Sequence, residues 1–230
     1  MSTRRRKVSD EEVFDAAQRA MTQHGPHELT LADIAGEAGV TPGLLVQRFG
    51  SKRQLLLTLS ERFSRSAPAV FERLRAAHRE PLATLRAYAA CMGDLASTPD
   101  ALSRNLAYLQ IDLTDDAFRA HLLTNARATR REIQGLLRSA VVAGELQKNV
   151  DSRRLARTIE AVIGGSLMSW ACYRQGPAAT WIRQDLDAVL RPHLARVRDA
   201  KPFKPDRGAG SLRLVTSPVT SKGRRGTKST

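Results

Sequence analysis

Apolar residues recur at helical spacing through most of the 230-residue chain. Between residues 10 and 23, Val13, Ala16, Ala17, Ala20 and Met21 lie three or four positions apart and share one helical face. Similar stripes, separated by breaks rich in Gly, Pro or Asp, predict further helices. These helices are expected at residues 31–38, 42–48, 52–66, 68–79, 82–97, 100–112, 116–144, 152–174 and 178–198. The pattern predicts an all-α fold.

Capping signals mark where the first helices begin and end. Ser9 with Glu12 is a capping box before the first helix, and Thr30 with Asp33 resembles a second capped start. Gly39 supplies the left-handed residue that a tight turn requires. Two short helices, joined by this turn, are therefore expected between residues 31 and 50.

The second of these helices is too short to bury much surface by itself. Thr41 is a good N-cap, and Pro42 fits the first helical position because no N–H is needed there. Leu45 and Phe49, four residues apart, are expected to face inward. The outward positions then carry Gly43, Leu44, Gln47 and Arg48.

Two helices joined by a short glycine-containing turn, the second polar outside, are typical of a helix-turn-helix motif. Its second helix enters the major groove, where Gln reads adenine and Arg reads guanine. Gly43 permits close approach of the backbone, and residues at helix N-termini favour phosphate. The predicted DNA-binding residues are Thr30, Thr41, Pro42, Gly43, Leu44, Gln47, Arg48 and Lys52. Capping signals are also ordinary in any three-helix packing unit, so each one alone is weak support.

Charge and composition are consistent with a nucleic-acid partner. The chain has 37 Lys and Arg against 23 Asp and Glu, a formal net charge of +14, and much of the excess lies at the two ends. We call residues 1–8 the basic arm and residues 201–230 the basic tail; the tail is rich in Pro, Gly, Ser and Thr and is predicted to be disordered. Basic ends are often only solvated termini, but they favour a polyanion such as DNA.

Several other functional classes are not expected. The two cysteines, Cys91 and Cys172, lie far apart without metal-ligand spacing, so no metal or cofactor is predicted. No apolar run approaches a membrane span and no apolar stretch follows the basic start, so we expect a soluble, cytoplasmic protein with no membrane partner. The chain also lacks the common phosphate-loop, dinucleotide and hydrolase motifs, which argues against an enzyme.

The stretch LTLADIAGEAGVTPGLLVQRFGSKRQLL resembles the DNA-binding region of tetracycline-repressor (TetR) family regulators. The match includes Gly43, Leu45, Phe49, Lys52 and Leu55, while Val46 and Arg48 stand where the family usually has Tyr and His. The resemblance is specific over about the first 66 residues and looser, in architecture only, beyond them. It implies a DNA-binding domain at 9–66, with a phosphate contact from Lys52, and a helical effector-binding and dimerisation domain at 67–200.

The resemblance further implies a homodimer that binds a near-palindromic operator and is released by an unknown small-molecule effector. Apolar stripes on the last two helices are then expected to face the second subunit, although such stripes more often form a chain's own core. The expected dimer residues are Leu155, Ile159, Ile163, Ser166, Ile182, Leu186, Val189, Leu190 and Leu194. The expected effector-pocket residues, each of which also fits plain core, are Tyr88, Met92, Leu95, Tyr108, Ile111, Phe118, Leu122 and Asn125.

The predicted function is a sequence-specific transcriptional regulator, most simply a dimeric repressor. Two other classes remain open at the level of sequence. One is a helical ligand-binding or scaffold protein whose DNA-binding helices have lost their function. The other is an architectural protein that binds DNA without sequence preference through its basic ends.

Overall fold

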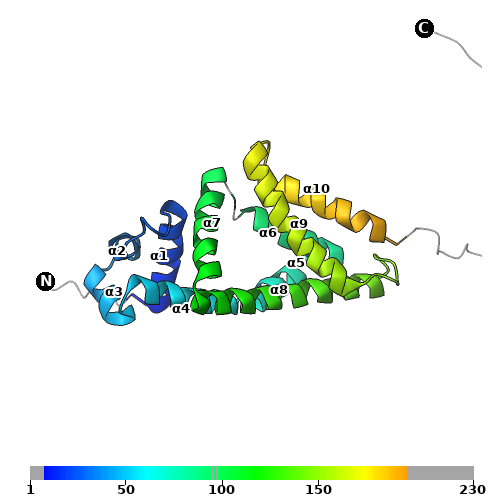
Figure 1. Ribbon diagram of the computed structural model, residues 1–230. Helices are drawn as coiled ribbons and strands as arrows, with labels where there is room; N and C mark the ends of the chain where they lie inside the picture. Colours follow the sequence, from blue (N-terminus) through cyan, green and yellow to red (C-terminus); the bar gives the residue numbers. More distant parts are fainter. Residues whose placement is uncertain (1–7, 95, 97, 196–230) are drawn as a thin grey trace, which may run out of the picture. The chain divides into compact units, whose positions relative to one another are not determined.

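The computed structural model describes residues 8–94, 96 and 98–195, and helices make up most of this part of the chain (Figure 1). Apart from one isolated bridge between Leu146 and Leu194, the described residues contain no β-structure. The all-α prediction is confirmed. The helices are α1 (Asp10–Gln23), α2 (Leu31–Ala38), α3 (Pro42–Phe49), α4 (Lys52–Ser64), α5 (Ala67–Ala77), α6 (Pro81–Asp94), α7 (Pro99–Thr114), α8 (Asp116–Val142), α9 (Ser152–Tyr173), α10 (Ala178–Leu190) and the 3-10 turn η1 (Arg191–His193).

The predicted capping signals are present and fix the helix ends. The Ser9 backbone N–H donates to the Glu12 carboxylate at 2.8 Å, while the Ser9 hydroxyl accepts from the Glu12 N–H at 3.2 Å. Thr30 and Asp33 repeat this arrangement at α2. The last helix is the main error in the predicted bounds, because α10 ends at Leu190 instead of residue 198. Pro192 has no backbone N–H to continue the helix, and the chain passes into the short turn η1.

The first four helices, which we call the head, share one apolar core. Val13, Leu29, Ile34, Leu45 and Leu55 are fully buried in it, and they come from α1, the α1–α2 loop, α2, α3 and α4. Each helix therefore contributes its apolar stripe to the same cluster. The small helices α2 and α3 are held by this shared core, because neither is long enough to be stable alone.

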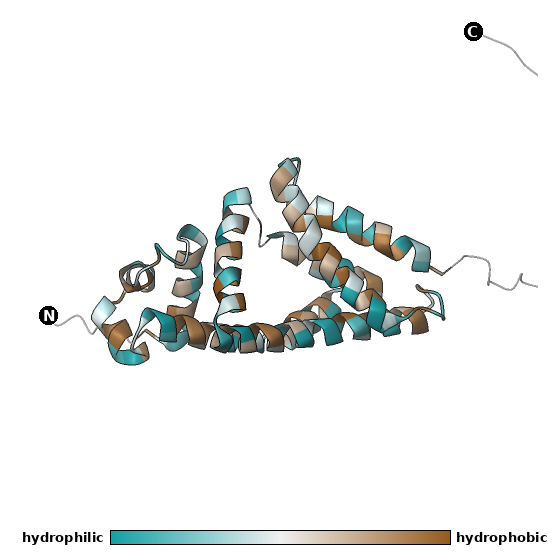
Figure 2. Cartoon of the chain, viewed as in Figure 1, coloured by the Kyte–Doolittle hydropathy of each residue, from teal (hydrophilic) through white to brown (hydrophobic). Residues whose placement is uncertain are grey.

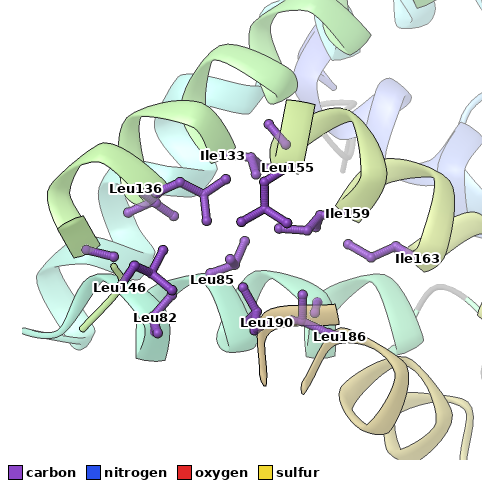
Figure 3. Close-up of a cluster of buried hydrophobic side chains, with 14 of the residues drawn as sticks. Leu82, Leu85, Ile133, Leu136, Leu146, Leu155, Ile159, Ile163, Leu186 and Leu190 are labelled. Carbon is purple, nitrogen blue, oxygen red and sulfur yellow. The ribbon is translucent and has the colours of Figure 1, made fainter. Parts of the chain in front are cut away.

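A second core lies among α5, α6, α8, α9 and α10 (Figure 3). Its fully buried members include Phe71, Leu85, Ile133, Ile159 and Ile182, one from each of these helices. Apolar and polar residues alternate along α8 and α9, as Figure 2 shows, so these long helices present one apolar side and one polar side. A smaller cluster formed by Ala96, Leu102, Trp170 and Ala178 joins α7 to the ends of α9 and α10.

Helices α6 and α10 approach each other closely at Gly93. A Cβ placed on Gly93 would lie 2.7 Å from the Cα of Ala179, which is closer than real side chains tolerate. We expect Gly93→Ala to lower the free energy of unfolding by about 1–3 kcal/mol, because α10 must move away from α6. The matched control is Gly135→Ala in α8, where a Cβ meets no atom within 4 Å. It should stabilise the protein by about 0.5–1 kcal/mol through helix propensity alone. Urea denaturation followed by circular dichroism compares the two, and equal effects would contradict this account.

None of the helices in the described ranges is both long and apolar enough to cross a membrane. The basic tail and residues 1–7 of the basic arm lie outside the described residues.

Candidate nucleic-acid interface

The helix-turn-helix geometry is set by a glycine turn and one buried leucine. Helix α2 ends at Gly39, whose φ of 67° is the left-handed conformation that the sequence predicts. Thr41 then caps α3, its hydroxyl accepting from the Leu44 N–H at 3.4 Å. Leu45 is fully buried in the head core and fixes the rotation of α3 about its axis. The opposite side of α3 consequently faces outward.

The outward side of α3 is suited to contact a groove. Thr41, Pro42, Gly43, Val46 and Gln47 are all exposed. A Cβ at Gly43 would meet no atom within 4 Å, so this position offers open backbone to a partner. Within the described chain, no hydrogen bond engages the Gln47 amide, which leaves both its donors and its acceptor for a base edge. Leu44 is half-buried and lies at the border of this surface.

Arg48 lies elsewhere and has partners of its own. One guanidinium nitrogen donates to the Val8 carbonyl at 2.8 Å, and another forms an ion pair with the Asp10 carboxylate. Its side chain is 25% exposed and the guanidinium carbon lies 5.7 Å from the centre of the Phe49 ring. In this structure Arg48 thus joins the end of α3 to the start of α1, and base reading by Arg48 stays a prediction.

Lys52 also has partners within the head. Its Nζ donates to the carbonyls of Pro26 and Leu29, at 3.0 and 2.7 Å. These carbonyls belong to the α1–α2 loop, so the ammonium group holds this loop against the start of α4. The ammonium group of Lys52 is thus engaged internally, and its phosphate contact stays a prediction. A partner 26 residues away in sequence is a contact that helix periodicity alone does not reveal.

Thr30 remains exposed at the N-terminus of α2, where it is engaged with Asp33. The Thr30 hydroxyl donates to the Asp33 carboxylate at 2.6 Å, and the Thr30 N–H donates to it at 2.7 Å. These two hydrogen bonds lower the pKa of Asp33, because they favour the ionised carboxylate. The Ser51 hydroxyl caps α4 by accepting from the Gln54 N–H at 3.1 Å.

The residues expected to line one effector pocket are divided among different contacts. Tyr88 and Met92 pack against the second core, and the Tyr88 ring stacks on Phe71 with centres 4.5 Å apart. Burial, and to a smaller extent the nearby Glu160 carboxylate, raises the pKa of Tyr88 to about 12. Ile111 and Leu122 are half-buried, and Leu95 lies outside the described residues. The seven of these residues that the structure describes thus make separate contacts.

Three of those predicted pocket residues instead join the head to the helices that follow. The Tyr108 hydroxyl donates to the His24 carbonyl at 3.0 Å, and burial raises the pKa of Tyr108 to about 12, which keeps this donor protonated. The Asn125 amide donates to the Phe63 carbonyl at 2.9 Å, at the end of α4. Phe118 is buried beneath the Arg53 guanidinium. Their place in an effector pocket stays a prediction.

Two further contacts connect the head to α7 and α8, and sequence patterns did not indicate them. Arg104 on α7 donates to the Thr22 carbonyl at 2.8 Å. Arg53 on α4 pairs with Asp115, the N-cap of α8, at 2.7 Å. The hydrogen bond from Arg53 is the main cause that lowers the pKa of Asp115. This contact is therefore complete at neutral pH and weakens as the pH falls through the lowered pKa.

The expected dimer stripes are mostly part of the chain's own core. Leu155, Ile159, Ile163, Leu186 and Leu190 point into the second core, as Figure 3 shows. Ile182 is buried there too, Val189 packs against it, and the Ser166 hydroxyl donates to Asp185 of α10 at 2.6 Å. Only Leu194 among the nine is exposed. The prediction that these side chains face a second subunit is corrected for the eight residues other than Leu194, since these eight pack within one chain.

The exposed side of α9 is made of different residues. Ala161, Gly164, Gly165, Met168 and Cys172 are all exposed, and they recur at three- and four-residue spacing. Side chains at Gly164 and Gly165 would meet no atom within 4 Å. The small residues of α9 thus lie on the face opposite to its apolar stripe, which is the face that we expected to meet a second subunit.

A short, capped helix that follows a glycine turn and presents open backbone and a free amide is typical of a helix-turn-helix DNA-binding protein. Family models agree with this class: residues 13–59 match "Bacterial regulatory proteins, tetR family", and residues 106–186 match "Tetracyclin repressor-like, C-terminal domain". The chain belongs to the TetR family and is a DNA-binding transcriptional regulator.

Individual relatives match over different lengths. The regulator BetI of Agrobacterium fabrum is 51% identical over 45 residues, which cover 20% of this chain and 22% of that protein. The regulator TtgR of Pseudomonas putida is 27% identical over 201 residues, covering 80% of this chain and 93% of that protein. A TetR regulator of known structure from Haloarcula marismortui has a TM-score of 0.64 at 21% identity, covering 80% of this chain and 97% of that chain. The chain thus matches BetI over only about a fifth of the length of that protein.

Proposed function

We propose that this regulator is a cytoplasmic, non-enzymatic homodimer that represses transcription by binding a near-palindromic operator, and that a small molecule releases it. The observation that carries the DNA-binding part is the outward side of α3, where an unengaged Gln47 amide stands one helical turn from the open backbone of Gly43. Thr41, Pro42 and Leu44 border the same surface, and together with Thr30 at the start of α2 they are proposed to set its register on the duplex.

Selection of duplexes from random DNA by the full-length protein tests this function. A sequence-specific dimer enriches a palindrome with half-sites about 34 Å apart, because two α3 helices then reach successive major grooves. A protein whose α3 has lost its function enriches nothing and retains no duplex. An architectural protein retains DNA without enriching a sequence, which would also contradict the proposal.

Gln47→Ala is expected to lower operator affinity by about 1–3 kcal/mol and to relax the preference for one base pair, because the amide contacts a base edge. The exposed position of Gln47 leaves the free energy of unfolding unchanged within about 0.5 kcal/mol. Gln110→Ala, at an exposed glutamine of α7, is the matched control and should leave affinity and preference unchanged. Affinity measured on the selected duplex and on each single-base variant checks the prediction. A uniform loss across all duplexes would contradict base reading by Gln47.

The exposed side of α9 supports the proposed dimer. Its small residues permit close helix approach, and Met168, which is 40% exposed, supplies apolar area beside them. We expect Gly165→Leu to keep the single chain folded, since a Cβ there meets no atom within 4 Å, but to weaken dimerisation at least tenfold, which is about 1.4 kcal/mol. Gly135→Leu on α8 is the control at another open glycine. Sedimentation equilibrium measures both, and an unchanged dimer for Gly165→Leu would place the interface elsewhere.

The contacts between the head and α7 and α8 support control by a ligand. Tyr108 and Arg104 hold α7 to the end of α1, while Arg53 and Asn125 hold α8 to the two ends of α4. A ligand that favours another position of α7 or α8 thus changes the position of the head. The extent of release is limited by the ligand's difference in affinity between the two states.

A further inference from the structure

We propose that Val46 is a specificity-determining residue of α3 that recognises the C5-methyl group of a thymine in the major groove. The inference rests on the proposed function and deepens it, because it names a base at a position that the Gln47 amide does not read. It begins from an exposed apolar side chain: Val46 is 48% exposed, and it lies on the outward side of α3 with Gly43 and Gln47.

Large apolar side chains are almost all covered in the head. Among those that the structure describes in α1 to α4, only Val46 and Phe63 are exposed. Phe63 lies at the far end of α4, where its carbonyl accepts the Asn125 amide of α8 at 2.9 Å. Single apolar residues are common on protein surfaces, but Val46 belongs to the surface that α3 presents to DNA. Val46 is therefore the large apolar side chain that a bound duplex meets.

The backbone next to Val46 allows close approach to the bases. Val46 lies one helical turn after Pro42 and Gly43, which are also exposed. Gly43 has no side chain, and a Cβ built there meets no atom within 4 Å, so α3 can lie deep in the groove at this turn. The Val46 carbonyl accepts the Gly50 N–H at 2.8 Å, which closes the last turn of the helix. A side chain as short as valine reaches a base edge from this position only because the helix can approach so closely.

The chemistry of valine selects one group in the groove. Its side chain has neither donor nor acceptor, so it forms no hydrogen bond to a phosphate or to a base edge. Thymine is the DNA base that presents a methyl group in the major groove, and apolar side chains contact this group. Because valine in a helix strongly prefers one χ1 rotamer, little side-chain entropy is lost on contact. Val46 therefore favours thymine at one position of each half-site.

The test removes the methyl group from the DNA and the valine from the protein in turn. The full-length protein binds the selected operator and duplexes in which each thymine is replaced by deoxyuridine, which pairs as thymine does and lacks only the C5-methyl group. We expect one thymine in each half-site whose replacement lowers wild-type affinity about fourfold, as for the loss of one buried methyl group. Val46→Ala should lower affinity for the thymine duplex by at least this factor and bind both duplexes equally, because the contact is already lost.

Two control variants separate this contact from other effects. Gln47→Ala should lower affinity but keep the preference for thymine over deoxyuridine at this position, because the amide reads another base. Val142→Ala, at a valine that is 90% exposed at the end of α8, should leave both affinity and preference unchanged. Circular dichroism checks that each variant is folded. Alanine at position 46 should not weaken α3, since its helix propensity is higher than that of valine.

The other outcomes overturn the inference. Wild-type affinity that is unchanged by deoxyuridine at every position shows that no methyl group is read. A Val46→Ala variant that keeps the wild-type preference for thymine shows that Val46 does not read the methyl group. These results leave the proposed function intact, whereas wild-type protein that retains no duplex contradicts that function and the inference with it.

Discussion

Replacing Ile159 with alanine is expected to lower the free energy of unfolding by about 2–5 kcal/mol, the largest effect of any substitution considered for this protein. Ile159 is fully buried in the second core, among residues of α5, α6, α8 and α10. Truncation leaves a cavity that these helices fill only partly. Urea denaturation followed by circular dichroism measures the change.

The same substitution tests whether Ile159 packs in the core of one chain or in the dimer interface. If Ile159 packs within one chain, the loss of stability is the same at every protein concentration. Met168→Ala on the exposed side of α9 is the control, and it should leave unfolding of the single chain almost unchanged while it weakens dimerisation. A loss at Ile159 that disappears when the protein is diluted to monomers would restore the original assignment of this residue to the dimer interface.

Lys52→Met is expected to lower the free energy of unfolding by about 3 kcal/mol, because two carbonyls lose a charged donor. The aliphatic part of the side chain is kept, so the change removes mainly the ammonium group. If Lys52 contacted phosphate instead, the variant would remain stable and the salt dependence of DNA binding would decrease. We expect the reverse: reduced stability and an unchanged salt slope. Measuring both quantities on one variant separates the internal contact from the phosphate contact.

Arg53→Met gives a neighbouring comparison for Lys52→Met. Arg53 is the next residue along α4. Its guanidinium pairs with Asp115, whereas Lys52 binds the α1–α2 loop. Its more exposed ion pair is expected to contribute less than about 1 kcal/mol. A similar loss of stability from both variants would indicate a general effect of removing charge from the start of α4.

Local signals predicted the elements well because they act over short distances. The Ser9 and Thr30 capping boxes, the left-handed Gly39 and the proline at the start of α3 each involve residues at most three positions apart. Such signals located the turn between α2 and α3 and identified Leu45 as the inward residue. Helical periodicity also predicts that Gln47 is exposed, since it lies two positions from Leu45 on the far side of the helix.

Sequence patterns did not indicate the contacts between residues far apart in sequence. Arg48 lies on the outward half of α3, but its partners Val8 and Asp10 are about 40 residues earlier. The sequence pattern correctly indicates an apolar stripe on α9, but helical periodicity does not say which helices cover this stripe. Packing against α6, α8 and α10 covers it within one chain. Side-chain donors to remote carbonyls, such as Tyr108 to His24, leave no periodic trace at all.

The two ends of α4 have a practical meaning for protein engineering. Arg53 near its start and the Phe63 carbonyl near its end are both bound by side chains of the α7–α8 region, Asp115 and Asn125. A chimera that joins the head to the effector-binding domain of another regulator would separate those pairs at the fusion point. Such hybrids should therefore exchange Arg53 together with its carboxylate partner, and retain an amide donor for the end of α4, if sensing is to be transmitted to the head.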